Sequence, residues 1–309
     1  MNKVTVINAT SLDEAVSALG SNSAVLAGGT DILNVLKAFI LPDPPDTLVN
    51  IKTIPGLSYI EENGGMLKIG AATKLADIAE SSVVNGKWSS LAQAARAVGS
   101  PQLRHMGTIA GNLVQDCRCW YYRAEQMGFN CFRKGGTLCF LTAGNNDKHS
   151  AIFGGQVCFT NSVSDTANPL VALDATIVTT KRNIPAGDLL VVLGNILDDN
   201  EIITEIQVPE PAAGTSQVFL KWAERKAIDF AEVSVATAIS SSGAKIVLGG
   251  VAPVPWRATA AEAALPDVDA AATASVDGAF PLPANGTGNI GNRYKIQLTK
   301  AMVKRALQA

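Results

Sequence analysis

The sequence lacks an excess of charge of one sign and lacks long apolar runs. Lys and Arg total 25 against 27 Asp and Glu, which gives a formal net charge of -2. Proteins that hold a phosphate backbone use clustered basic residues, so we expect no nucleic-acid partner. The most apolar stretches, such as residues 32–41, are interrupted by Lys37, whereas a helix needs about 20 apolar residues to cross a bilayer. We expect no membrane span and no membrane partner.

Several local signals are missing as well. The first ten residues, MNKVTVINAT, show neither the apolar run nor the small-residue cleavage site of a signal peptide, so a cytoplasmic protein is expected. The glycine-bearing turn at residues 28–31 is not the nicotinamide fingerprint G-x-G-x-x-G, so a nicotinamide Rossmann fold is not supported there. Only two histidines are present: His149 is expected to be a surface side chain, and His105 is assigned no role.

The hydrophobic pattern of the 309 residues predicts two domains or three small ones. In the first half, expected strands at residues 4–7, 24–27, 47–51 and 66–69 alternate with expected helices at residues 32–39, 75–80 and 89–98. Ser11 and Glu14 form the pattern of a helix capping box. The opening of the chain therefore reads as α/β.

The second half leans towards β-sheet. Strands are expected at residues 175–180, 201–208, 218–223, 233–240 and 245–248, and the Pro- and Gly-bearing stretch 209–214 is the best candidate for a domain boundary. Ala-rich helices are expected around residues 258–264. A last helix is expected to present Tyr294, Leu298, Ala301 and Met302 on one face.

All five cysteines fall between residues 117 and 158, in a stretch rich in Gly, Asn, Arg and aromatic residues with little periodicity: Cys117, Cys119, Cys131, Cys139 and Cys158. We name residues 117–158 the cysteine segment and expect it to be an inserted loop. An odd count without a secretory signal disfavours disulfides. Structural zinc sites present close pairs with two to four intervening residues. Here the only close pair is Cys117 and Cys119, with one residue between them, and the remaining gaps are long and unequal. An iron-sulfur cluster held by four thiolates is therefore favoured over zinc.

Basic residues accompany these cysteines. Arg118, Arg123, Arg133 and Lys134 could offset the negative charge of thiolates and tune a cluster, although each read singly is a solubilising surface residue.

Two glycine-bearing turns could hold a phosphate. The first glycine turn, Ala27, Gly28, Gly29, Thr30 and Asp31, joins an expected strand to an expected helix. The second glycine turn is formed by Thr108, Ile109, Ala110, Gly111 and Asn112. Taken alone, each of these two motifs is more simply explained as an ordinary turn.

Taken in order, the motifs resemble the FAD-binding medium subunit of the molybdenum hydroxylases, the xanthine dehydrogenase and carbon monoxide dehydrogenase family. They are LAGGTD at residues 26–31, LRHMGTIAGN at 103–112, SDTANPL at 164–170, KWAERKAIDF at 221–230, LGGVA at 248–252 and NRYK at 292–295. The resemblance implies an α+β fold. Residues 1–212 would form two α/β subdomains of the PCMH-type (VAO-like) FAD-binding fold, and residues 213–309 a C-terminal α+β domain resembling that of the CO dehydrogenase flavoprotein.

The resemblance also implies the sites. Both glycine turns would contact the FAD diphosphate, and Asp165, Ile202 and Lys221 would make further flavin or adenine contacts. The cysteine segment is similar to that of the 4-hydroxybenzoyl-CoA reductase beta subunit and of bacterial aldehyde oxidoreductase FAD subunits, which implies a 4Fe-4S cluster. The implied ligands are Cys119, Cys131, Cys139 and Cys158, with Cys117 as the spare thiol or an alternative first ligand.

The function implied is electron transfer rather than substrate chemistry, and no catalytic acid or base is expected in this chain. Expected partners are a molybdenum-cofactor large subunit, or a tungsten counterpart, a 2Fe-2S small subunit and an external redox protein such as ferredoxin. The substrate of the assembly could be an aldehyde, an N-heterocycle or an aromatic CoA ester. Two alternatives remain open, a self-sufficient flavin dehydrogenase and a structural zinc protein with a nucleotide-binding pocket.

Overall fold

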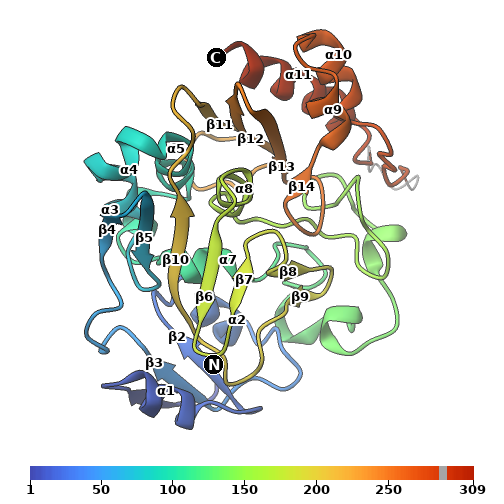
Figure 1. Ribbon diagram of the computed structural model, residues 1–309. Coiled ribbons are helices and arrows are strands. Elements are labelled where there is room, and N and C mark those ends of the chain that lie inside the picture. Colours follow the sequence, from blue (N-terminus) through green and yellow to red (C-terminus); the bar gives the residue numbers. More distant parts are fainter. Residues whose placement is uncertain (285–290) are drawn as a thin grey trace.

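The structure is a computed structural model and describes residues 1–284 and 291–309. Figure 1 shows the N-terminal subdomain at the bottom, a second subdomain in the middle and the C-terminal domain at the top, with the cysteine segment in green along one side. No helix in the described part has the length and apolar character needed to cross a membrane.

The N-terminal subdomain is a three-stranded parallel sheet of order β1-β3-β2, formed by β1 (Thr5–Asn8), β2 (Ser23–Leu26) and β3 (Thr47–Asn50). Helices α1 (Leu12–Ala18) and α2 (Ile32–Lys37) connect the strands. Ser11 caps α1 as expected, whereas Glu14 reaches back to Thr10 rather than to Ser11. Helix α2 ends two residues earlier than expected because Phe39 has a positive φ of 52°, which a continuing helix does not allow.

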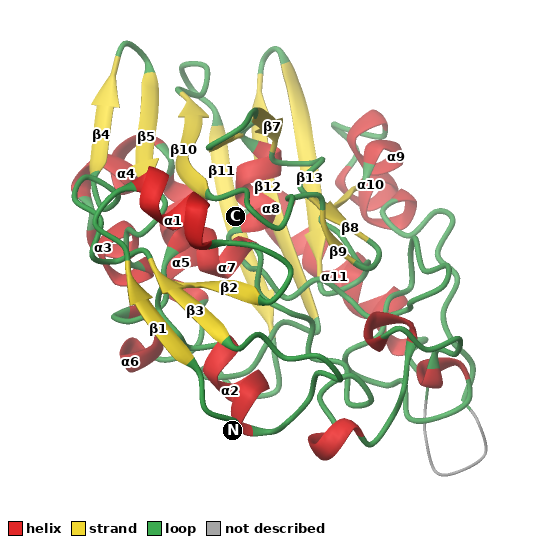
Figure 2. Ribbon diagram, turned by 90° about the horizontal axis from the view of Figure 1, so that it is seen from below, coloured by secondary structure: helices red, strands yellow, loops and turns green. Residues whose placement is uncertain are grey.

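The second subdomain is built on a five-stranded antiparallel sheet of order β4-β5-β10-β6-β7. Its strands are β4 (Ile60–Asn63), β5 (Met66–Gly70), β10 (Ile203–Pro209), β6 (Thr176–Thr179) and β7 (Asn183–Pro185), and a hairpin of β8 (Leu190–Val191) and β9 (Gly194–Asn195) follows β7. Strand β10 returns from far along the chain to lie between β5 and β6 (Figure 1), and Figure 2 shows it beside β5. The parallel α/β rhythm expected for this part is therefore limited to the N-terminal subdomain.

Short helices cover this sheet and form the largest core. They are α3 (Leu75–Glu80), α4 (Ser82–Lys87), α5 (Ser89–Ala97), α6 (Pro101–Arg104), α7 (Ile109–Leu113) and α8 (Ala167–Ala172). Leu67, Ile69 and Ile206 from the sheet pack in one cluster with Leu91 from α5. Trp88 is fully buried, and its ring N–H donates to the carbonyl of Pro209 at 2.8 Å, so a polar atom at the core is satisfied.

The cysteine segment contains only 3-10 turns as regular elements: η1 (Glu125–Met127), η2 (Phe132–Lys134) and η3 (Phe140–Thr142). This agrees with the irregular loop expected from its composition. The segment is tied to the N-terminal subdomain, because the backbone N–H groups of Gln126 and Met127 donate to the carbonyls of Ala38 and Phe39 at 3.0 and 3.1 Å.

In its described residues, the C-terminal domain pairs a four-stranded antiparallel sheet with three helices. The sheet order is β11-β12-β13-β14, with β11 (Ser216–Trp222), β12 (Val233–Ser240), β13 (Gly243–Gly249) and β14 (Trp256–Arg257). The helices are α9 (Thr259–Ala263), α10 (Val268–Ala274) and α11 (Tyr294–Gln308), and α11 packs on β11 and β12. Phe219 of β11 is buried with Ala94 of α5, which joins this domain to the second subdomain. The expected α+β class is confirmed.

Helix α11 buries a charged residue that periodicity does not identify. Met302 is buried as expected and Ala301 is exposed, so the apolar face is rotated from the expected one. Lys295 is fully buried. Its ammonium donates to the carbonyls of Lys148 at 2.7 Å, Ser150 at 2.9 Å and Gly250 at 2.8 Å. One side chain thus connects α11, the cysteine segment and the end of β13.

We expect Lys295→Met to lower the free energy of unfolding by roughly 2–4 kcal/mol, because it leaves buried carbonyls without donors. Lys304→Met is the matched control on the same helix. The Lys304 ammonium pairs with the exposed carboxylate of Asp269, and such surface pairs contribute about 0–1 kcal/mol. Chemical denaturation of both variants measures the difference. Equal losses in the two variants would contradict the role given to Lys295.

Candidate functional site

The first glycine turn lies between β2 and α2 with its residues partly exposed. Gly29 has a φ of 71°, a conformation that glycine adopts without strain. Within residues 1–284 and 291–309, the backbone N–H groups of Gly28, Gly29 and Thr30 have no protein acceptor. Three neighbouring free donors at a partly exposed turn are suited to an anionic group.

The second glycine turn is the start of a helix rather than a turn. Thr108 is the N-cap of α7, and its hydroxyl accepts from the N–H of Gly111 at 3.2 Å. The N–H groups of Ile109 and Ala110 donate to the carbonyls of Thr73 and Ala71 at 3.0 and 3.2 Å. Two of the five backbone N–H groups of this motif therefore hold α7 against residues 71–73, and those of Gly111 and Asn112 donate to Thr108 within the motif.

The two motifs touch each other. A Cβ atom built on Gly28 would lie 2.2 Å from the carbonyl oxygen of Met106, and it would also lie 2.9 Å from the Cα atom of Gly107. Neither contact can be relieved by a side-chain rotation, because both involve backbone atoms. Only glycine at position 28 allows the two motifs to approach this closely.

Asp31 ends the first glycine turn and holds the cysteine segment. One carboxylate oxygen accepts from the guanidinium of Arg123 at 2.8 Å and from that of Arg118 at 2.9 Å. The other oxygen accepts from the N–H of Asp116 at 2.8 Å. Burial and the neighbouring Arg123 lower the pKa of Arg118, and Asp31 opposes that shift. The side chain of Asp31 thus anchors the segment.

The SDTANPL motif joins the second glycine turn to the C-terminal domain. The side-chain carbonyl of Asn112 accepts from the hydroxyls of Ser164 and Thr166 at 2.9 and 2.6 Å. Asp165 is buried, and its carboxylate pairs with the ammonium of Lys221 on β11 at 2.7 Å. Burial raises the pKa of Asp165, and Lys221 acts against that rise. The structure therefore brings the predicted residues Asn112, Asp165 and Lys221 into one connected network.

Ile202 does not belong to that network. Its side chain is buried in the apolar cluster of the N-terminal subdomain with Ala9 and Ile51. Its backbone N–H and C=O are both bonded to Thr180, at 3.2 and 2.9 Å. A flavin contact by Ile202 stays a prediction from the family resemblance.

Four cysteines line one hollow of about 260 Å³, which we name the thiol hollow. Its lining residues are Cys119, Tyr121, Tyr122, Cys131, Phe132, Arg133, Leu138, Cys139, Phe140, Val157 and Cys158. Cys117 lies outside this set. It lines a neighbouring hollow of about 390 Å³, together with Val114 from the end of α7 and Asn195 of the β8–β9 hairpin.

The thiols of this hollow have perturbed acidities. A hydrogen bond with Cys158 lowers the pKa of Cys139 to about 7, and the same hydrogen bond together with burial raises the pKa of Cys158. Burial raises the pKa of Cys119 to about 12. In the described part of the chain, no three His, Cys, Asp or Glu side chains converge as they would around a single metal ion. The four cysteines share the lining of the thiol hollow.

One basic side chain, Arg133, lines the thiol hollow, and a second, Lys134, lies next to its lining residue Tyr122. The guanidinium of Arg133 lines both hollows, and Lys134 is only 6% exposed. The sequence does not predict that Lys134 is buried, because the residue taken singly is expected at the surface.

The expectation that His149 is a surface side chain is wrong. Its side chain is half-buried rather than on the surface, with its ring 5.8 Å from that of Trp120. Burial, with the nearby positive charge of Lys295, lowers the pKa of His149 to about 4, so the ring is neutral at physiological pH.

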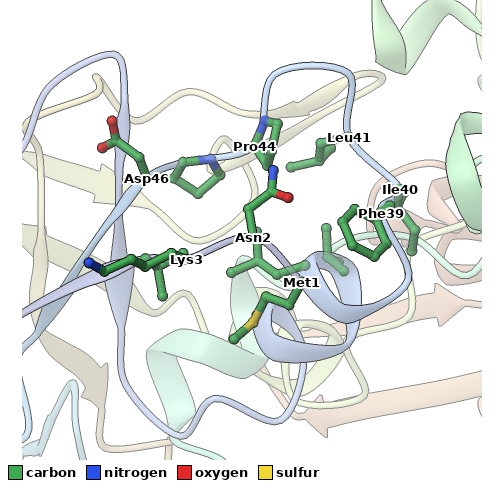
Figure 3. A pocket seen from close by; sticks show the side chains of 12 residues that line it. Met1, Asn2, Lys3, Phe39, Ile40, Leu41, Pro44 and Asp46 are labelled. Carbon is green, nitrogen blue, oxygen red and sulfur yellow. The ribbon is translucent and has the colours of Figure 1, made fainter.

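A separate hollow of about 380 Å³ lies beside the N-terminus (Figure 3). Its walls come from Met1 to Val4, the end of α2 and the segment before β3, and they include Phe39, Ile40 and Leu41. None of the predicted site residues lines it, so we assign it no part in the site.

Comparison with known proteins accounts for both halves of the chain. Residues 2–211 match the family described as the FAD binding domain in molybdopterin dehydrogenase, and residues 218–309 match the CO dehydrogenase flavoprotein C-terminal domain. The chain is 32% identical to the aldehyde oxidoreductase FAD-binding subunit PaoB of Escherichia coli, with 91% of this chain and 89% of that protein aligned. It is 30% identical to the carbon monoxide dehydrogenase medium chain of Hydrogenophaga pseudoflava, over 97% and 94% of the two chains.

Solved structures agree with this relationship. The carbon monoxide dehydrogenase of Hydrogenophaga pseudoflava superposes with a TM-score of 0.77 at 29% identity, covering 100% of this chain and 97% of that chain. Quinoline 2-oxidoreductase of Pseudomonas putida 86, at 19% identity, has the same fold with a TM-score of 0.76 over 99% and 96% of the chains. The chain therefore belongs to the FAD-binding medium-subunit family of the molybdenum hydroxylases, whose members are oxidoreductase subunits with the substrate chemistry on a separate subunit.

Proposed function

We propose that this chain carries FAD and a 4Fe-4S cluster as the electron-transfer subunit of a heteromeric molybdenum or tungsten hydroxylase. In this role it relays electrons between a 2Fe-2S subunit and an external redox partner. An aldehyde is the substrate class favoured by the likeness to the aldehyde oxidoreductase subunit, with N-heterocycles and aromatic CoA esters as the other classes. The proposal of a cluster rests on one observation, namely that four cysteines line the same hollow, the thiol hollow.

The residues present fit FAD. The free N–H groups of Gly28, Gly29 and Thr30 would hold the diphosphate, with Ala27 and the N–H of Asp31 beside them. The second motif, from Thr108 to Asn112, would border the same groups because the residues directly before it, Met106 and Gly107, lie against Gly28. The Asp165–Lys221 pair would meet the flavin, with Lys221 reaching from the C-terminal domain.

The residues also fit a four-iron cluster better than a single ion. Zn–S bonds of about 2.3 Å bring four thiolates to within about 4 Å of one another, whereas a cubane takes each thiolate on a different iron. Cysteines arranged around a hollow favour the second arrangement. The ligands we propose are Cys119, Cys131, Cys139 and Cys158, with Cys117 as the spare thiol.

Bound flavin and cluster together would supply one- and two-electron exchange. The chain's own residues bind, orient and shield them: Asp31 holds the cysteine segment against the flavin motif, and Arg133 lies between the thiol hollow and the hollow next to α7. The relay thus runs from the flavin motifs through the thiol hollow, in either direction.

The mouth of the thiol hollow is where we place the external redox partner, a protein such as ferredoxin. Leu138 and Val157 line the hollow and are 61% and 43% exposed. Trp120, Met127 and Phe129 of the same segment are also exposed. The large and small subunits would contact other faces of the chain.

We also propose that the complex is cytoplasmic. The boundary between the FAD-binding domain and the C-terminal domain is proposed to lie after residue 212.

Iron and flavin analysis of the purified chain tests the proposal directly. We expect one FAD and about four irons per chain, because four cysteines bind one cubane. Cys119→Ser is expected to lose most of the iron and keep the flavin, whereas Cys117→Ser is the matched control and keeps both. Zinc in place of iron, or a loss of iron in Cys117→Ser alone, would contradict this assignment.

Gly28→Ala tests the contact between the two flavin motifs. The added methyl would meet the carbonyl of Met106, and we expect the flavin content after purification to fall at least tenfold. Gly20→Ala is the control, since a Cβ atom there has nothing within 4 Å. Flavin absorbance per protein measures both. Full flavin content in Gly28→Ala would show that the turn does not bind FAD.

Leu138→Ser tests the docking of the redox partner. Removal of an exposed apolar side chain at an interface centre costs about 1–3 kcal/mol, so electron transfer to a protein acceptor should slow by about tenfold or more. Transfer to a small dye should stay unchanged. Phe280→Ser, at a side chain that is 75% exposed and does not line the hollow, is the control. An equal slowing in both variants would place the partner elsewhere.

A further inference from the structure

Lys134 is a buried cation with no hydrogen-bond partner for its ammonium among the described residues. Its side chain lies in η2, directly after Arg133, and the residue is 6% exposed. Its backbone N–H donates to the carbonyl of Cys131 at 2.8 Å, which fixes the residue against one of the proposed ligands. Within the described residues its ammonium makes no hydrogen bond. Lysine is almost never fully buried unless it is paired, so the position requires an explanation.

The groups around the Lys134 ammonium indicate what could balance its charge. The aromatic ring of Tyr122 lies 5.7 Å from the nitrogen and offers a weak cation–π contact. The titratable groups that face the ammonium are the thiols of Cys131 and Cys119, both on the thiol hollow. No carboxylate is among them. The negative charge that would balance Lys134 must therefore come from the thiolates and from what they hold.

Arg133, which lines the thiol hollow, also has a buried donor without an acceptor. One guanidinium nitrogen, Nη2, donates to the carbonyl of Val192 at 2.9 Å, and the side chain lines the thiol hollow together with Cys158. Its Nε atom is buried and has no acceptor in the part of the chain that the structure describes. Two adjacent residues thus present unused N–H donors beside four thiols.

We propose that the Lys134 ammonium and the Arg133 Nε–H donate hydrogen bonds to sulfur atoms of the cluster and raise its reduction potential. This inference rests on the proposed four-iron cluster. Four thiolates give such a cluster a net negative charge, and reduction adds one more electron. A buried cation stabilises the reduced form more than the oxidised form, because charge interactions are strong in a desolvated site. Lys134 and Arg133 are therefore positioning and charge-compensating residues, not ligands.

The test is a potentiometric titration of the full complex, followed by the electron paramagnetic resonance signal of the reduced cluster. In Lys134→Met the reduced-to-oxidised ratio at a fixed potential should fall about tenfold, a midpoint lower by about 59 mV for a one-electron couple. Arg133→Met should shift the midpoint in the same direction. Lys134→Arg keeps the charge and should stay near wild type. Lys148→Met is the control, because that surface ammonium already pairs with Glu224.

Measurement of iron and sulfide content distinguishes a failure of the proposed function from a failure of the inference about Lys134. If the wild-type chain holds no iron, the proposed function fails, whatever Lys134 does. If Lys134→Met holds its iron and its midpoint is unchanged, or shifts only as far as in Lys148→Met, the inference is overturned. If Lys134→Met loses its iron, the Lys134→Arg variant distinguishes the two explanations. A cluster retained in Lys134→Arg at the wild-type midpoint potential supports the role of the positive charge. Loss of the cluster in Lys134→Arg refutes that role.

Discussion

The carboxylate of Asp31 ties together the two regions on which the proposed chemistry depends. It ends the first glycine turn, and it accepts from Arg118, Arg123 and the N–H of Asp116, all at 2.8–2.9 Å. Without it, two neighbouring guanidiniums would face each other partly buried, and like charges at such a distance repel strongly in a desolvated setting. The position of the cysteine segment, and hence of the thiol hollow relative to the flavin motifs, follows from this ion-pair network.

Other contacts bring distant parts of the chain to the same place. Gly28 allows the first glycine turn to lie against Met106, and Lys221 reaches from the C-terminal domain to Asp165 beside the second motif. Lys295 fastens α11 to the end of the cysteine segment. A flavin held by these elements would be enclosed by all three parts of the molecule, which is a suitable arrangement for a cofactor that exchanges electrons rather than binding a large substrate.

The sequence alone predicted the family, the α+β class and most strands, because hydrophobic alternation and ordered motifs are local signals. Strand β12 was predicted to the residue. The place of β10 between β5 and β6 could not be predicted, since it depends on pairing between distant segments. The second glycine turn proved to be a helix, because carbonyls of Ala71 and Thr73 complete its hydrogen bonds. The burial of Lys134 likewise depends on tertiary packing, which single-residue composition does not report.

The central claim is that one chain holds both a flavin and an iron-sulfur cluster for electron transfer. An anaerobic reductive titration of the purified chain, followed by visible absorption, counts the electrons that it accepts. One FAD and one cubane together should take about three electrons per chain, two on the flavin and one on the cluster. A chain that takes about two, with the bleaching of flavin alone, would contradict the relay.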